Sequence, residues 1–144
     1  MKEKILVSAC LLGANCKYDG KNNKNNGVIS LKSKYELIPV CPETLGGLKA
    51  PRCPSELRGG RVFAKDGTDV TEYFINGAEK TLETAKRNGC SRAVLKARSP
   101  SCGSKAIYDG SFSGKVIGGD GVAARILKDN GIKVYTENEL EELD

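Results

Sequence analysis

The chain has 144 residues and 39% hydrophobic content, which suits one domain with a buried core and is too short for two domains of ordinary size. Its 23 basic and 18 acidic residues give a formal net charge of +5, and the basic residues are scattered along the chain. This charge does not favour nucleic-acid binding and suits a small anionic or polar substrate equally well. We therefore expect a single domain over residues 1–144.

The amino-acid composition also excludes several kinds of catalytic and metal-binding site. The chain has no histidine, which excludes Ser-His-Asp and Cys-His nucleophile systems, zincin sites and two-His-one-carboxylate iron sites. Its first apolar stretch is short and is broken by Ser8, so the sequence predicts neither a signal peptide nor a membrane span and indicates a cytoplasmic protein. In that reducing compartment, six cysteines indicate metal binding or catalysis rather than disulfides.

The first half of the chain alternates apolar runs with polar loops. Residues 5–9 and 37–40 predict the first two strands, and a short helix is expected between them over 27–34. The glycine- and asparagine-rich loop 11–26 is long for an unstructured connection, which is typical of functional or mobile segments, so it is a candidate lid. Residues 41–60, dense in Gly and Pro, predict a second large loop.

The second half continues the alternation. Its predicted elements are a small strand at 61–64, a helix from about 71 to 87 with a side-chain cap at 69–71, a strand at 93–96, a hairpin or loop insertion at 107–114, a helix at 121–129 and a strand at 132–135. The long helix has one apolar stripe, formed by Tyr73, Phe74, Gly77, Ala78, Leu82 and Ala85. This alternation predicts a Rossmann-like α/β fold, with a mostly parallel sheet flanked by helices.

Three cysteines each lie just past a predicted strand, namely Cys10, Cys41 and Cys102. The carboxyl ends of parallel strands line a common crevice, so we expect these three thiolates to converge on one point. Without histidine, such a point favours an all-thiolate metal or cluster site.

The other three cysteines carry weaker signals. Cys90 is expected to be an ordinary buried thiol, because free cysteine behaves as a small hydrophobe. Cys16 and Cys53 lie in polar loops and are spare thiols, extra ligands or merely tolerated residues. No two of the six cysteines form a CxxC pair, so zinc-ribbon and ferredoxin spacings are absent.

The motifs around the three cysteines are specific. They read Ser-Ala-Cys-Leu-Leu-Gly at 8–13 with Lys-Tyr-Asp-Gly at 17–20, Val-Cys-Pro-Glu at 40–43, and Leu-Lys-Ala-Arg-Ser-Pro-Ser-Cys-Gly at 95–103. With these motifs the chain resembles the DUF523 family, which includes a thiouracil desulfidase. Residues 107–114 and 131–134 fit as well, so the resemblance covers almost the whole chain.

The resemblance implies a cofactor and a reaction. It implies a 4Fe-4S cluster held by Cys10, Cys41 and Cys102, with a fourth iron that has no protein ligand. It further implies non-redox desulfuration of a thiolated nucleobase or related thioamide, such as 2-thiouracil to uracil plus sulfide. The substrate sulfur would bind the open iron, for which a soft thiocarbonyl sulfur is a well-matched ligand.

A hydrolytic desulfuration must activate water and move protons. Without histidine the nearest candidate is Glu43, two residues beyond Cys41, although a helix-capping or solvent-facing carboxylate is the alternative. Ser101, next to Cys102, is a candidate to bind the substrate or shuttle a proton, with Ser99 as its substitute. Candidates to orient the substrate, with exposed charge as the alternative, are Tyr18, Asp19, Arg52 and Lys96.

Two other functions stay open at this point. One is a non-catalytic iron-sulfur or metal-binding module in sulfur handling or sensing. The other is a small α/β binding domain whose cysteines are ordinary reduced thiols.

Overall fold

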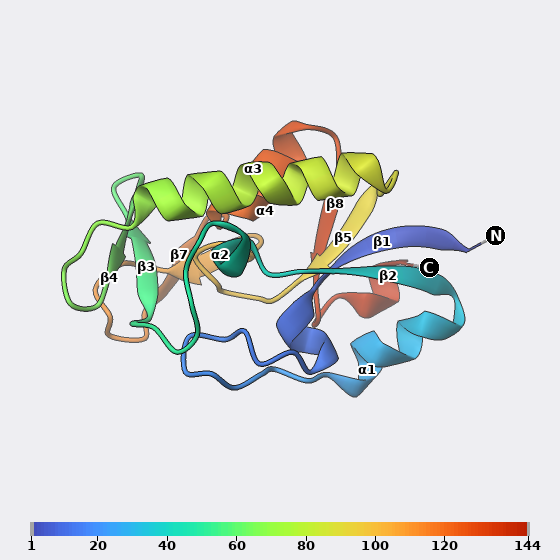
Figure 1. The fold of residues 1–144 in the computed structure, drawn as a ribbon, viewed down its shortest axis with the longest axis horizontal. Coiled ribbons are helices and arrows are strands. Elements are labelled where there is room, and N and C mark those ends of the chain that lie inside the picture. The colour runs from blue at the N-terminus through green and yellow to red at the C-terminus, as the bar shows by residue number, and fades with distance from the viewer. Residues whose placement is uncertain (1, 144) are drawn as a thin grey trace.

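The computed structural model describes residues 2–143 and has a four-stranded parallel sheet at its centre (Figure 1). The strand order is β2-β1-β5-β8. The strands are β1 (Glu3–Ser8), β2 (Tyr35–Val40), β5 (Arg92–Leu95) and β8 (Lys133–Thr136). The predicted α/β class and mostly parallel sheet are therefore confirmed. Within residues 2–143 no helix is long and apolar enough to cross a membrane.

Helices cover both faces of the sheet because the strands are apolar on both sides. Leu6 of β1 packs toward α3 (Thr71–Arg87) and α4 (Val122–Asp129), which lie above the strands in Figure 1. Ile5 and Val7 point to the opposite face. The short elements there are η1 (Ala9–Leu12), α1 (Asn26–Ile29), η2 (Ser30–Ser33) and η3 (Leu140–Leu143).

Two small hairpins stand beyond the carboxyl ends of the parallel strands (Figure 1). One pairs β3 (Ser55–Arg58) with β4 (Arg61–Ala64), and the other pairs β6 (Ala106–Tyr108) with β7 (Val116–Gly118). Phe74, near the start of α3, packs with Val62 of β4 in a separate apolar cluster. The carboxylate of Glu56 in β3 accepts a hydrogen bond from the backbone N–H of Gly110, which lies between β6 and β7. This bond joins the two hairpins. They form one wall of the site described below.

The structure differs from the sequence prediction in three places. The helix expected over 27–34 is divided into α1 and the 3-10 turn η2. The predicted loop 41–60 contains α2 (Pro42–Leu45) and β3. Strand β3 carries a single large apolar residue, Leu57, so periodicity did not reveal it. Tyr73 lies outside the buried stripe of α3 and is 45% exposed.

Helix α2 is short, yet it is held closely against α3. A Cβ atom at Gly77 of α3 would collide with the carbonyl oxygen of Pro42, and one at Gly46 would collide with the carbonyl oxygen of Tyr73. The two backbones therefore touch with no side chain between them. This contact fixes the position of Cys41 and Glu43, which lie at the start of α2.

Candidate active site

A cavity of about 500 Å³ opens at the carboxyl ends of β1, β2 and β5. Strand β1 lies between β2 and β5, and the chain crosses one sheet face to reach β2 and the other to reach β5. Such a switch point is where open α/β sheets bind ligands. The structure places Cys10, Cys41 and Cys102 in the lining of this one cavity.

Each of these three sulfur atoms accepts a hydrogen bond from a neutral side chain. Ser8 Oγ lies 3.3 Å from Cys102 Sγ, and Thr44 Oγ1 lies 3.2 Å from Cys41 Sγ. The amide of Asn23 reaches the third sulfur, with Nδ2 3.5 Å from Cys10 Sγ. The three donors come from separate segments, namely the end of β1, helix α2 and the loop that precedes α1. Sequence reasoning missed all three.

Cys16, whose role the sequence left open, is a fourth cysteine in the cavity lining. Hydrogen bonds from its thiol lower the pKa of Cys10 to about 7 and the pKa of Cys41 to about 5, against the opposing effect of burial. The same bonds raise the pKa of Cys16 itself. Cys10 and Cys41 are thus disposed to be thiolates, the form that binds metals.

Cys102 differs from them because it is buried. Burial raises its pKa to about 12, while the hydrogen bond from Ser8 lowers the pKa. A bound cation deprotonates a coordinating thiol, so this pKa does not prevent Cys102 from acting as a ligand.

The other sequence-predicted residues divide into two groups. Cys53 is exposed, with its sulfur 3.8 Å from Asp66 Oδ2, and Cys90 is buried in the core beneath α3 and α4. Neither lines the cavity, and Asp19 does not line it either. Those that do line it are Tyr18, Glu43, Arg52, Lys96, Ser99 and Ser101.

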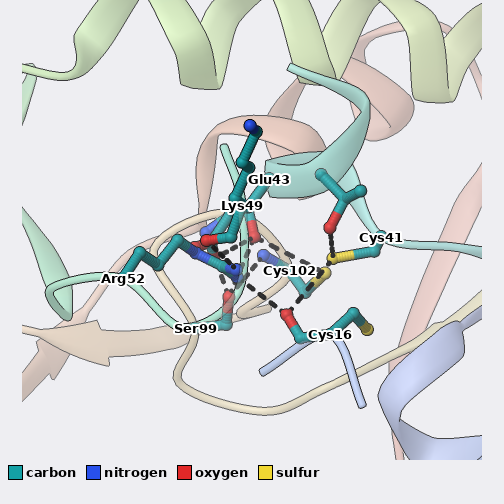
Figure 2. A network of polar contacts seen from close by, with 9 residues as sticks. Cys16, Cys41, Glu43, Lys49, Arg52, Ser99 and Cys102 are labelled. Atoms are coloured by element: carbon teal, nitrogen blue, oxygen red, sulfur yellow. Dashed lines mark hydrogen bonds and ion pairs between the residues drawn. The ribbon is translucent and has the colours of Figure 1, made fainter. Parts of the chain in front are cut away.

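Glu43 is held at both of its carboxylate oxygens (Figure 2). Arg52 Nε donates to Oε1 over 3.0 Å, and Ser101 Oγ donates to Oε2 over 3.1 Å. The side chains of Arg52 and Glu43 are only 11% and 15% exposed, so Glu43 is not a solvent-facing carboxylate. Burial raises the pKa of Glu43, while the charge of Arg52 opposes that rise. Ser99 Oγ lies 3.0 Å from Ser101 Oγ and extends the network.

Arg52 also joins the loops around the cavity. Its Nη2 donates to the carbonyl oxygen of Cys16 over 2.9 Å, and its Nη1 donates to that of Lys49 over 3.2 Å (Figure 2). Its backbone N–H donates to the carbonyl oxygen of Tyr18. The sequence suggested that Arg52 orients a substrate, whereas in the structure its guanidinium is bonded to Glu43 and to two loop carbonyls.

The donor set of the cavity suits an iron-sulfur cluster better than a single ion. Within residues 2–143 no group of three His, Cys, Asp or Glu side chains is close enough to hold one metal ion. A cube of four irons is larger than one ion, so its cysteine ligands stand further apart. Three cysteine sulfurs around a cavity of about 500 Å³, each with its own hydrogen-bond donor, fit such a cluster.

Comparisons with known proteins agree with this geometry. The family model of 2-thiouracil desulfurase matches residues 5–139. The chain is 43% identical to YbbK, an uncharacterized protein of Bacillus subtilis (strain 168), over 149 residues that cover 96% of this chain and 99% of the relative. It is also similar to a solved structure of the 4Fe-4S-dependent thiouracil desulfidase TudS, which carries the DUF523 designation. The TM-score is 0.93 at 43% identity, covering 99% of this chain and 95% of that chain.

Proposed function

Because the chain belongs to the 2-thiouracil desulfurase family, we propose that it is a 4Fe-4S-dependent desulfidase acting on a thiolated nucleobase. The reaction would convert a compound such as 2-thiouracil to uracil plus sulfide, without net redox change. The observation that carries the proposal is the single cavity that three cysteines and the Glu43 network share.

Cys10, Cys41 and Cys102 are the proposed ligands, since all three line the cavity and each sulfur accepts a hydrogen bond. When bound, the cluster supplies an iron without a protein ligand, which is a Lewis acid toward a soft thiocarbonyl sulfur. Cys16 lines the same cavity but serves in this proposal as a hydrogen-bond donor to Cys10 and Cys41.

Glu43 is the proposed proton acceptor for the water that replaces sulfur. Burial raises the pKa of Glu43 and so its affinity for a proton, while the charge of Arg52 opposes that rise. The hydroxyl of Ser101 donates to Oε2 of Glu43, and Ser99 lies next along the same chain of hydroxyls. Ser99 Oγ accepts from the backbone N–H groups of Ser101 and Cys102, so this chain of hydroxyls donates toward Glu43 and orients its carboxylate.

The charges of the cavity support a small-molecule substrate rather than a nucleic-acid chain. Three of the five cations in its lining are already paired, Arg52 with Glu43, Lys17 with Asp19 and Lys96 with Glu137, which leaves Lys65 and Arg98. Polymer binding needs a row of cations free to neutralise phosphates. We further propose that the enzyme works in the cytoplasm, where reducing conditions keep the cluster-binding cysteines as thiols.

The test is anaerobic reconstitution with iron and sulfide, followed by metal and sulfide counts and an assay with 2-thiouracil. We expect about four irons per chain, broad absorbance near about 400 nm and release of sulfide with uracil. A full cluster without sulfide release would instead identify a non-catalytic iron-sulfur module. A chain that takes up no iron would be a binding domain with ordinary thiols, and either result would overturn the proposal.

A further inference from the structure

The hydroxyl of Ser8 is fixed in direction by its neighbours. Ser8 ends β1 and is only 2% exposed, so water does not compete for its hydroxyl. The backbone N–H of Lys96, just past β5, donates to Ser8 Oγ over 2.9 Å. With that lone pair engaged, the hydroxyl proton points to Cys102 Sγ, 3.3 Å away. The bond from Lys96 to Ser8 thus links the ends of the neighbouring strands β5 and β1 at the edge of the cavity.

Thr44 and Asn23 repeat this arrangement at the other two sulfurs. Thr44 lies three residues after Cys41 in α2, and it is an exposed residue whose hydroxyl donates to Cys41 Sγ. Asn23 donates twice to Cys10, through Nδ2 to the sulfur and through its backbone N–H to the carbonyl oxygen at 2.9 Å. Each donor is neutral, so the set adds no charge to the site.

We propose that Ser8, Thr44 and Asn23 are positioning residues for the cluster, one for each ligand sulfur. The inference rests on the proposed function for the identity of the ligands. Hydrogen bonds to cluster sulfurs stabilise the extra negative charge of the reduced cluster, and so they raise its reduction potential. They also lessen electron donation from each thiolate to iron, which leaves the open iron a stronger Lewis acid for a thiocarbonyl sulfur.

Thr44 gives the sharpest test because it is exposed and its removal does not disturb the core. Thr44→Val keeps the shape of the side chain and deletes only the hydroxyl, whereas Thr44→Ser keeps the donor. Thr84→Val is the control, since Thr84 is a half-buried helical threonine in α3, outside the cavity lining, whose hydroxyl donates to the carbonyl oxygen of Lys80. Ser8→Ala tests the buried position.

Two measurements besides turnover test the positioning role on anaerobic, cluster-loaded protein, namely the reduction potential and the rate of iron loss to a chelator. We expect Thr44→Val and Ser8→Ala to have a more negative reduction potential than wild type. We also expect roughly tenfold faster iron loss to a chelator, the lower end of the effect of outer-shell partners on metal sites. Thr44→Ser and Thr84→Val should match wild type in both readouts.

The outcomes separate this inference from the proposed function. If wild type holds the cluster and releases sulfide, but Thr44→Val keeps the wild-type potential and iron-loss rate, the positioning role is wrong and the proposed function stands. If wild type takes up no cluster, both fail. Should Ser8→Ala give no folded protein, the comparison of Thr44→Val with Thr44→Ser still decides.

Discussion

Ser101 Oγ donates to Glu43 Oε2 over 3.1 Å, which joins the loop after β5 to the first turn of α2 although the two residues are 58 positions apart. The bond aligns a hydroxyl with a buried carboxylate at the wall of the cavity. The other carboxylate oxygen accepts from Arg52, so both oxygens of Glu43 are fixed in direction.

Glu43→Gln should therefore separate chemistry from assembly. Glutamine has nearly the same size and is not a proposed ligand, so iron content should stay at the wild-type value. It cannot accept a proton as the carboxylate does, and we expect desulfuration of 2-thiouracil to fall about 10²- to 10⁴-fold, the usual contribution of general acid-base catalysis. Iron per chain and initial rates of sulfide release measure the two effects.

Glu56→Gln is the control for this substitution. Glu56 lines the same cavity, and its Oε1 accepts from the backbone N–H groups of Gly110 and Phe112, which a glutamine carbonyl can also accept. Its rate should stay close to wild type. Near-normal turnover of Glu43→Gln would remove the proton-transfer role. Joint loss of iron and turnover would make Glu43 a support of the Cys41 loop instead.

Each of the single substitutions Cys10→Ser, Cys41→Ser and Cys102→Ser should abolish or strongly weaken cluster incorporation. None of the three cysteines lies in a strand of the sheet, so far-ultraviolet circular dichroism should keep the α/β signature while the iron count falls. Cys53→Ser should keep full iron, since Cys53 lies outside the cavity lining. If Cys10→Ser kept its iron and Cys16→Ser lost it, Cys16 would replace Cys10 as the ligand.

Asp69 should make stability depend on pH in a defined window. Its carboxylate accepts from Thr71 Oγ1 at 2.6 Å and pairs with Arg61, and these contacts lower its pKa from 3.8 to about 2. A depressed acid pKa stabilises the fold above the unfolded value, and the effect is lost as pH falls through the folded value. The stability advantage over Asp69→Asn should therefore be constant above about pH 5 and vanish between about pH 4 and 2.

Urea unfolding of cluster-free wild type and cluster-free Asp69→Asn at a series of pH values measures the difference in their free energies of unfolding. The exposed Glu83→Gln variant supplies the baseline, because its i,i+4 pair with Arg87 is weak and lies at the opposite end of α3. A difference between wild type and Asp69→Asn that stayed flat down to about pH 2 would show that the carboxylate charge does not stabilise the start of α3.

Apolar runs in the sequence predicted the strands and the placement of Cys10, Cys41 and Cys102 near one another. They did not predict the side-chain contacts around the cavity. Short apolar runs predict β1, β2 and β5. Because the carboxyl ends of parallel strands lie at one edge of the sheet, the residues that follow these runs are expected there too. The bond from Ser8 to Cys102 spans 94 positions, and it depends on which strands are neighbours. Periodicity carries no information on that order. The same holds for Arg52, whose pairing with Glu43 depends on the path of an irregular loop.

The contact between α2 and α3 was also invisible in the sequence, where Gly77 was one small residue in an apolar stripe. In the structure its missing Cβ makes room for the carbonyl oxygen of Pro42, and Gly46 makes room in turn for that of Tyr73. Because backbone atoms cannot yield as a flexible side chain does, Gly77→Ala must push α2 away from α3. Overpacking of this kind typically costs about 1–3 kcal/mol.

We expect Gly77→Ala to lower iron incorporation and sulfide release together, because α2 carries both Cys41 and Glu43. The parallel sheet should stay formed, since the new methyl group lies at the interface of two helices. Asn76→Ala is the matched control, for it places alanine at the neighbouring exposed position of the same helix, where it meets no backbone. Iron per chain, turnover per iron and the thermal midpoint measure the effect on each variant. Full iron and normal turnover in Gly77→Ala would show that the seat of α2 on α3 does not set the position of Cys41 and Glu43.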